Sequence, residues 1–234
     1  MYIFGRSISA GKSTLCRSIE HNIKKYNINY KHYPEPINQK LLELFYSNID
    51  KYSFAFQCII IRERVHLMEE AINYLYSENG NMTVIDRSAI GDCAFALMLR
   101  KDNKINNEEF EVYADLTKSL KQMVSPSVSS CKRVIVYLNC ESNKARERVI
   151  NRGNAQEIKS CTPEYLENLN NSYNKVLSWN DSTGEELLVI KQVYDSIGTM
   201  DVISIDYNRD FRVVNGILSE SDTFMILKEI IDQL

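Results

Sequence analysis

The chain has 234 residues, of which 44% are hydrophobic and 25% charged, and its net charge is −3 at neutral pH. These values are typical of a soluble globular protein with a sizeable core, and they exclude a strongly basic protein with general affinity for nucleic acid. The sequence contains no run of about 18 apolar residues, so we expect no membrane span.

Taken in chain order, the predicted elements are a strand at residues 2–4, a helix at 13–26, a strand at 29–33, a helix at 54–75, a strand at 82–85, a helix at 107–123, a strand at 134–138, helices at 142–151 and 163–177, a strand at 202–205 and a helix at 223–234. The strands are short apolar runs, whereas the helices repeat apolar residues at steps of three and four. Thr162 and Pro163 predict a capped start for the helix that follows them.

This alternation of strands and helices predicts an α/β protein with a mostly parallel sheet of about five strands, flanked by helices on both faces. Residues 1–234 contain no repeat and no Pro/Gly/Ser-rich linker, so we expect a single domain. Residues 179–200 fit the alternation poorly, and we interpret them as a surface insertion. The six cysteines are scattered without a C-x-x-C pair, which argues against a zinc site and is typical of a reducing compartment. Because the first apolar run begins at residue 2, we also expect no signal or transit peptide.

The stretch IFGRSISAGKSTL, residues 3–15, joins the first predicted strand to the first predicted helix. It ends like the phosphate-binding pattern G-x-x-x-x-G-K-[ST], but Arg6 stands where the pattern has its first glycine. In such a loop the backbone N–H groups and the helix N-terminus surround the phosphates, Lys12 contacts them and Ser13 holds Mg²⁺. The alternative is an ordinary strand–helix turn that contains G-K-S by chance.

A second phosphate-type signal follows the strand predicted at residues 82–85. Asp86 places a carboxylate where a Mg²⁺-bound phosphate needs one, and Arg87 is suited to a phosphate oxygen. The alternative for an isolated Asp-Arg pair is a surface salt bridge. Two such signals at two strand ends favour a nucleotide-binding protein.

Six longer segments follow the loop in order: YPEPI (33–37), FYSNIDKYSFAFQ (45–57), DRS (86–88), RVIVYLNCESNKARERVINRGNAQE (133–157), PEYLENLNNSY (163–173) and IDYNRDF (205–211). Together they resemble the deoxyribonucleoside kinase family, which includes deoxycytidine, deoxyguanosine and insect multisubstrate kinases. The resemblance covers nearly the whole chain and implies a three-layer P-loop kinase fold with a lid at about residues 152–161. It also implies that the protein uses Mg²⁺ and transfers a phosphate from ATP or another NTP to the 5′-OH of a deoxynucleoside. The resemblance further implies a cytoplasmic homodimer.

The resemblance assigns catalytic and phosphate-binding roles residue by residue. Glu35, held between two prolines, matches the base that acts on the 5′-OH, although a glutamate in a rigid turn is the alternative. Arg87 matches the arginine near that hydroxyl, Lys12 is the phosphate-loop lysine, and Asp86 joins Ser13 as the candidate metal ligand. The residues matched to the phosphates and base of the donor are Ile8, Ser9, Ala10, Gly11, Lys12, Ser13, Thr14, Arg148, Arg152, Asp210 and Phe211.

Other residues match the family's nucleoside pocket. Gln57 matches the glutamine that pairs with the nucleobase, because an amide offers a donor and an acceptor side by side. Tyr46 and Glu157 match the pair on the sugar 3′-OH. Phe56 adjoins Gln57, and Phe95 matches an aromatic residue over the base, with a spacing from DRS that is one residue shorter. The alternative for the aromatic residues is core packing.

The base preference is inferred from two charged residues. Arg64 lies seven residues after Gln57, and Asp92 lies five after Arg87. Deoxycytidine and deoxyguanosine kinases carry an arginine and an aspartate at these spacings, where the pair closes the pocket against the thymine methyl group. The resemblance therefore implies a preference for deoxycytidine, deoxyadenosine or deoxyguanosine over thymidine. The alternative is a purely structural salt bridge.

Three positions depart from the family pattern. Arg6 replaces the first loop glycine, Asn154 replaces a lid arginine, and Lys40 replaces a tryptophan of the nucleoside pocket. Two other interpretations stay open. A thymidylate-kinase-like monophosphate kinase would share the loop and the D-R pair, but would have an arginine before its E-P and a glycine after it. A non-catalytic nucleotide-binding homologue would explain the departures.

Overall fold

The computed structural model describes residues 2–5, 8, 10–26, 28–36, 38–77, 82–128, 132–178, 186, 190–191 and 201–233. Its elements are β1 (Tyr2–Gly5), α1 (Lys12–Ile23), a 3₁₀ turn (Lys24–Tyr26), β2 (Tyr30–Tyr33), α2 (Gln39–Ser47), α3 (Ile49–Ser77), β3 (Met82–Asp86), α4 (Ala89–Lys101), α5 (Asn107–Val128), β4 (Val134–Asn139), α6 (Ser142–Arg152), α7 (Ala155–Ser160), α8 (Pro163–Leu177), β5 (Asp201–Asp206), β6 (Val213–Val214), β7 (Ile217–Leu218) and α10 (Glu220–Ile231). Among the residues so described, no helix combines the length and the apolar character needed to cross a bilayer.

A five-stranded parallel sheet with the order β2-β3-β1-β4-β5 forms the centre of the molecule. The middle strand, β1, places Phe4 opposite Asp86 of β3 and Val136 of β4. Strands β3 and β4 are almost entirely buried, as expected of a parallel sheet covered on both faces. The predicted α/β class and parallel sheet are confirmed.

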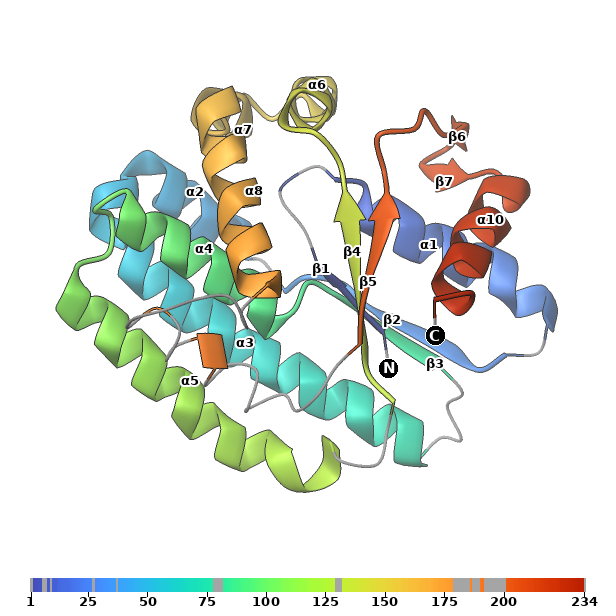
Figure 1. Ribbon diagram of the computed structural model, residues 1–234, viewed down its shortest axis with the longest axis horizontal. Helices are drawn as coiled ribbons and strands as arrows, with labels where there is room; N and C mark the ends of the chain where they lie inside the picture. Colours follow the sequence, from blue (N-terminus) through green and yellow to red (C-terminus); the bar gives the residue numbers. More distant parts are fainter. Residues whose placement is uncertain are drawn as a thin grey trace.

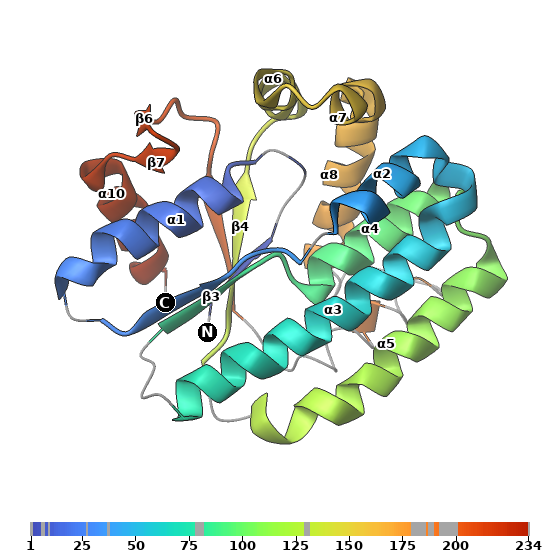
Figure 2. The same cartoon turned by 180° about the vertical axis from the view of Figure 1, so that it is seen from behind.

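Helices form one layer on each side of this sheet. Helices α1 and α10 lie on one side, and α3, α4, α5 and α8 lie on the other (Figure 1), an arrangement that Figure 2 shows from behind. Helices α6 and α7 lie beyond the ends toward which β4 and β5 point. The neighbouring strands β1 and β3 are followed by helices on opposite sides of the sheet, α1 on one side and α4 on the other. Ligands of open α/β sheets bind at the carboxyl ends of the strands beside such a reversal.

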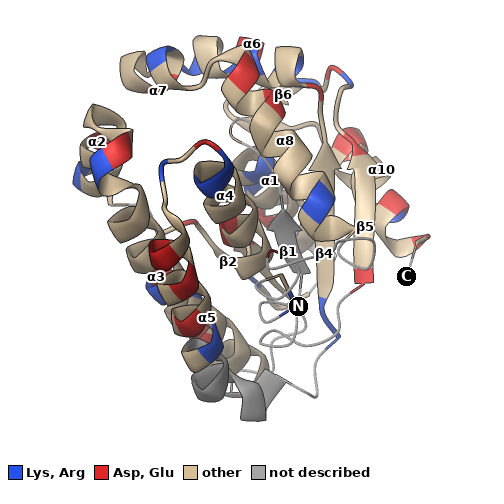
Figure 3. Ribbon diagram, turned by 60° about the vertical axis from the view of Figure 1, so that its left-hand side comes forward, with Lys and Arg blue, Asp and Glu red and all other residues tan. Residues whose placement is uncertain are grey.

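Local sequence signals explain two of these helices. In α1, Leu15, Cys16 and Ile19 are fully buried and form the face that covers the sheet. Helix α8 has the predicted bounds, because the Thr162 hydroxyl accepts a hydrogen bond from the N–H of Tyr165 at 3.1 Å and Pro163 opens the first turn. Figure 3 shows the charged residues concentrated on the helices and at strand ends.

Three helices, α2, α4 and α7, have no counterpart among the predicted elements. In α4, every residue from Ala89 to Leu99 is buried, so the helix has no polar stripe from which a helical period could be recognised. The Ser88 hydroxyl caps it by accepting the N–H of Gly91 at 3.2 Å. This helix matters because it carries Asp92 and Phe95.

Parts of the sequence prediction lie outside the described residues. Residues 6, 7 and 9, which include the unusual Arg6 and the predicted phosphate contact Ser9, are among them. Most of the segment interpreted as a surface insertion, residues 179–200, is also outside them. Within that segment Ile190 is described and fully buried, so at this point the chain packs into the core.

Candidate active site

A cavity, here called the inner cavity, opens beside the carboxyl ends of β1 and β3. The predicted site residues that line it are Ile8, Lys12, Ser13, Glu35, Tyr46, Phe56, Gln57, Arg87, Asp92, Phe95, Arg152 and Glu157. These residues come from the phosphate loop, the segments that follow β2 and β3, helices α2, α3 and α4, and the lid, so the fold brings together groups that are far apart in the sequence. The cavity therefore combines cations, carboxylates and an amide with aromatic walls, as a polar aromatic ligand requires.

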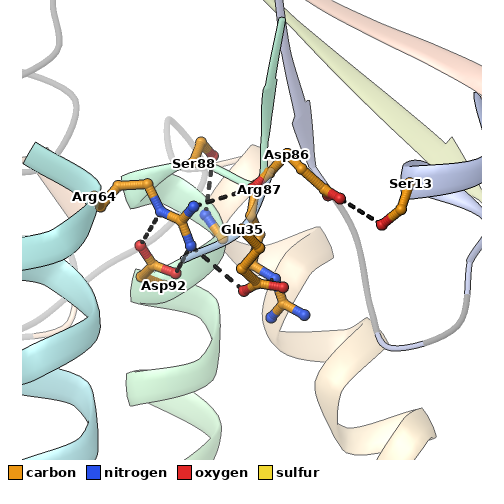
Figure 4. Close-up of polar contacts among 8 residues, drawn as sticks. Ser13, Glu35, Arg64, Asp86, Arg87, Ser88 and Asp92 are labelled. Atoms are coloured by element: carbon orange, nitrogen blue, oxygen red, sulfur yellow. Dashed lines mark hydrogen bonds and ion pairs between the residues drawn. The ribbon is translucent and has the colours of Figure 1, made fainter. Parts of the chain in front are cut away.

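Glu35 lies in this cavity between two arginines (Figure 4). Its Oε1 is 2.7 Å from Nε of Arg87 and 3.5 Å from Nη2 of Arg64. The carboxylate follows β2 and is flanked by Pro34 and Pro36, which restrict the backbone on both sides. With 17% of its side chain exposed, Glu35 can reach a ligand while its charge is balanced by the two guanidinium groups.

Arg87 is held in an unusual backbone conformation directly after β3. Its φ of 80° lies in the left-handed region, which costs a residue with a side chain on the order of 1 kcal/mol. The guanidinium carbon lies 4.6 Å from the centre of the Phe95 ring. Burial acts to lower the pKa of Arg87, but the carboxylate of Glu35 raises it, and the net pKa is above its usual value. Arg87 therefore presents a fixed positive charge to the cavity.

Arg64 and Asp92 form a bidentate ion pair in the interior. The Arg64 Nε donates to Asp92 Oδ2 at 2.9 Å, and Nη2 donates to Oδ1 at 3.1 Å. Nη1 of Arg64 also donates to the backbone carbonyl of Asp86 at 3.0 Å. Arg64 is fully buried, whereas Asp92 lines the inner cavity. Arg64 and Asp92, which the resemblance assigns to the nucleoside pocket, are therefore paired, and Arg64 lies behind Asp92 rather than in the cavity wall.

Ser13 lines the inner cavity and contacts Asp86, the last residue of β3. The Ser13 hydroxyl donates to Asp86 Oδ2 at 2.5 Å, while Asp86 Oδ1 is buried and has no hydrogen-bond partner among the described residues. One hydroxyl and one carboxylate with a spare oxygen suit Mg²⁺, which takes few protein ligands and completes its shell with phosphate and water. Within the described ranges no cluster of three or more metal-ligating side chains occurs, so such a metal would depend on the phosphates of a ligand.

A second cavity, here called the lid groove, lies on the other side of the phosphate loop. The predicted residues that line it are Gly11, Thr14, Arg148, Arg152, Asp210 and Phe211. Asp210 is 87% exposed and pairs with Lys144 at 2.5 Å, whereas the Phe211 ring packs against Tyr207. The groove is thus an open, aromatic-lined surface that adjoins the loop at Gly11.

Arg148 contacts the backbone of the phosphate loop in this structure. Its Nη1 donates to the carbonyl of Ala10 at 3.3 Å, and its Nη2 donates to the carbonyl of Tyr207 at 3.1 Å. One guanidinium therefore links the fully buried Ala10 of the phosphate loop to Tyr207, the residue that follows β5. Arg152 is the lid arginine that lines both the inner cavity and the lid groove.

The sugar-binding residues predicted from the resemblance are close to one another. Tyr46 and Glu157 both line the inner cavity, and the Tyr46 hydroxyl lies 3.8 Å from the thiol sulfur of Cys161. Arg152 pairs with Glu157 at 3.1 Å. Gln57 has 2% of its surface exposed, and its Oε1 has no hydrogen-bond partner among the described residues, which leaves it available to a ligand.

Tyr165 is a cavity residue that the sequence prediction did not single out. It lines the inner cavity, and its hydroxyl is buried with no hydrogen-bond partner in the described part of the chain. Burial raises its pKa well above the usual value, so the hydroxyl is a neutral donor or acceptor. The available signal was its place three residues after the helix cap Thr162, which fixes it in the first turn of α8.

We predict that Gly11→Ala disrupts the phosphate loop. Gly11 has a φ of +92°, and a Cβ there would lie 2.7 Å from Cε1 of Tyr207. Strain of about 1–3 kcal/mol would raise the KM for the phosphate donor by roughly five- to a hundredfold. Gly216→Ala is the matched control, because Gly216 has a φ of +76° and its added Cβ would meet only Arg17 at 3.8 Å. Equal donor KM values in the two variants would contradict the prediction.

Comparison with known proteins finds similarity to deoxynucleoside kinases throughout. The sequence model of the family described as deoxynucleoside kinase matches residues 3–232. A deoxyadenosine kinase of Dictyostelium discoideum is 27% identical over 214 residues, which cover 84% of this chain and 80% of that protein. A deoxyguanosine kinase of the same organism is 26% identical over 206 residues, which cover 87% of this chain and 67% of that protein. Deoxycytidine kinase 1 of Xenopus laevis is 25% identical over 230 residues, which cover 88% of this chain and 81% of that protein.

Solved structures show the same fold. A deoxyadenosine kinase of M. mycoides with the products dCMP and dCDP bound superimposes with a TM-score of 0.67 and 20% sequence identity, and each chain is covered over 100% of its length. The structure of the M. mycoides enzyme with bound dCTP gives a TM-score of 0.66 at 19% identity, covering 99% of this chain and 100% of that one.

Proposed function

The chain belongs to the deoxynucleoside kinase family, and from this premise we propose that it transfers the γ-phosphate of ATP or another NTP to the 5′-OH of a deoxynucleoside. The observation that carries the proposal is the pair of cavities that meet at the phosphate loop. The inner cavity takes the nucleoside, and the lid groove takes the base and sugar of the donor. Arg152 lines both, so the transferring phosphoryl group passes beside it.

Glu35 acts on the acceptor hydroxyl in this proposal. A carboxylate within hydrogen-bond reach of the 5′-OH accepts its proton as the bond to phosphorus forms. Arg87, 2.7 Å away, keeps Glu35 oriented and places a positive charge where the transferred oxygens gain charge. Lys12 and Arg152 add positive charges on the donor side. Such charges stabilise the negative charge of the transferring phosphoryl group and so accelerate its transfer.

Ser13 and Asp86 would hold the Mg²⁺ that accompanies the donor. The ion supplies charge neutralisation on the β- and γ-phosphates. The support is Oδ1 of Asp86, which is buried and has no hydrogen-bond partner in the described part of the chain, next to the Ser13 hydroxyl that contacts Oδ2.

Asp86→Asn is expected to weaken the use of magnesium. An amide keeps the shape of the side chain but removes its charge, so the Mg²⁺ concentration for half-maximal activity should rise by about tenfold or more. Asp115→Asn, an exposed position on α5, serves as the control. An unchanged magnesium requirement in Asp86→Asn would remove Asp86 from the metal site.

The nucleoside preference is proposed to be deoxycytidine, deoxyadenosine or deoxyguanosine over thymidine. The support is the Arg64–Asp92 pair, whose aspartate lines the same cavity as Gln57. A wall carboxylate can accept a hydrogen bond from an exocyclic amino group, which thymine lacks. The kinases named above as relatives carry the same three substrates in their names.

A comparison of two substrates tests the site of phosphorylation. 2′-Deoxyadenosine should be phosphorylated in the presence of ATP and Mg²⁺, whereas 2′,5′-dideoxyadenosine, which lacks the 5′-OH, should bind without giving product. Phosphorylated product from the 5′-deoxy compound would show that another hydroxyl is the acceptor. Absence of both nucleotide product and ATP consumption would favour the non-catalytic alternative.

We also propose that the protein is a cytoplasmic homodimer. The support is the family membership and, for the location, the scattered cysteines of the sequence. Light scattering of the purified chain across a concentration series tests the oligomeric state, and a mass of about one chain throughout would contradict it.

A further inference from the structure

The lid contains a tight turn that joins the last residue of α6 to the first residues of α7. Gly153, with a φ of 78°, ends α6 by donating its N–H to the carbonyl of Ile150 at 3.0 Å. Arg152 precedes this turn and Glu157 follows it, and the two side chains pair at 3.1 Å. The geometry of the turn therefore sets where both charged groups lie.

Asn154 occupies the N-cap position of α7. Its Oδ1 accepts hydrogen bonds from the N–H groups of Gln156 at 3.0 Å and Glu157 at 3.1 Å. Its backbone carbonyl accepts the N–H of Ile158 at 2.9 Å. One side chain thus satisfies two N–H groups that the helix itself cannot pair, and one of them belongs to Glu157.

Helix α7 depends on such contacts because it has only six residues. A helix this short is unstable on its own, so its ends decide whether it forms. At its C-terminal end the Arg146 guanidinium donates to the carbonyls of Ile158 at 2.7 Å and Cys161 at 2.8 Å. Asn154 performs the corresponding role at the N-terminal end, next to the cavity.

We propose that Asn154 is a positioning residue for the sugar end of the nucleoside. By capping α7 it holds Glu157 against the inner cavity, where Glu157 is 8% exposed, and through the ion pair it holds Arg152 at the boundary of the two cavities. Its substitution for the lid arginine of related sequences would then exchange a direct phosphate contact for a fixed position of Glu157. The proposal rests on the proposed function, because it assigns Glu157 to the sugar of a deoxynucleoside.

The test compares Asn154→Ala with Asn154→Ser, in which the hydroxyl can still cap. Loss of a cap of this kind corresponds to about a fivefold change in an equilibrium. Asn154→Ala should lower, by about fivefold, the preference in kcat/KM for 2′-deoxyadenosine over 2′,3′-dideoxyadenosine, which lacks the 3′-OH. Asn154→Ser should restore the preference. A merely structural role would lower kcat/KM for both compounds equally, and that result would overturn the proposal.

Asn106→Ala is the matched control for the same chemical change. Asn106 Oδ1 accepts the N–H of Glu109 at 2.8 Å at the start of α5, a cap outside the residues that line either cavity. This variant should lose similar stability and keep the substrate preference.

Amide hydrogen exchange gives a readout that does not need catalysis. In Asn154→Ala the amides of residues 155–160 should exchange at least about fivefold faster than in the native chain. Unchanged exchange would overturn the capping role even in a protein without kinase activity. Absence of deoxynucleoside phosphorylation by the native chain, with faster exchange in Asn154→Ala, would instead reject the proposed function.

Discussion

Replacing Glu35 by glutamine is expected to lower kcat for deoxynucleoside phosphorylation by about 10²- to 10⁴-fold, the range typical of a lost general base. Glutamine has the same shape and can still hydrogen-bond the 5′-OH, but it cannot accept the proton at neutral pH. The KM for the deoxynucleoside should therefore change by much less than kcat. Steady-state kinetics with saturating ATP and Mg²⁺ would measure both parameters.

Two observations would separate chemistry from structure in this variant. Glu35 pairs with Arg87 at 2.7 Å, so its neutralisation leaves a buried guanidinium with less compensation, and the melting temperature should be recorded alongside the kinetics. Glu111→Gln, an exposed position on α5, is the control for the chemical change itself. Activity within threefold of the native chain in Glu35→Gln would show that this carboxylate is not the base.

Removing the Asp92 carboxylate is expected to cause the largest loss of stability. Asp92→Ala leaves the charge of Arg64, whose side chain is 0% exposed, buried without its bidentate partner. Breaking one side of a buried pair costs about 3–5 kcal/mol, which corresponds to a fall in melting temperature of roughly 10 °C for a chain of this size. Asp50→Ala, which breaks the exposed pair of Asp50 with Lys104, should have a small effect by comparison.

The double variant Arg64→Leu/Asp92→Ala separates stability from base preference. Because both charges are removed together, it should be more stable than Asp92→Ala alone. If Asp92 reads the base, the double variant should gain thymidine activity relative to deoxycytidine and deoxyadenosine. An unchanged order of substrates in a well-folded double variant would leave the pair with a structural role only.

The elements that the sequence predicted well are those whose pattern is local. Helix α8 begins where Thr162 and Pro163 predict, because a cap and an N1 proline act on their own first turn. Strands β3 and β4 could be recognised as short apolar runs, because nearly all of their residues are buried. Helix α4, in contrast, is buried on all sides from Ala89 to Leu99, and a helix without a polar face has no period to detect.

The site was predictable only where residue type and order carry the information. The phosphate loop and the D-R pair could be predicted from their positions after strands, whereas the role of Glu35 was expected only from the resemblance to deoxyribonucleoside kinases. The resemblance paired Arg64 with Asp92 and Ser13 with Asp86, but the hydrogen bonds of these pairs could not be predicted, because the partners lie 28 and 73 positions apart in the sequence. The capping role of Asn154 was also hidden, since α7 is too short to have a detectable helical pattern.

A panel of five acceptors tests the central claim most directly. The purified chain is incubated with ATP, Mg²⁺ and one of deoxycytidine, deoxyadenosine, deoxyguanosine, thymidine or dTMP, and the nucleotide products are quantified. We predict 5′-monophosphates from the deoxynucleosides, with kcat/KM for thymidine below that for at least one of the other three, and no product from dTMP. Phosphorylation of dTMP alone would contradict a deoxynucleoside kinase, and thymidine as the best substrate would contradict the role assigned to Arg64 and Asp92.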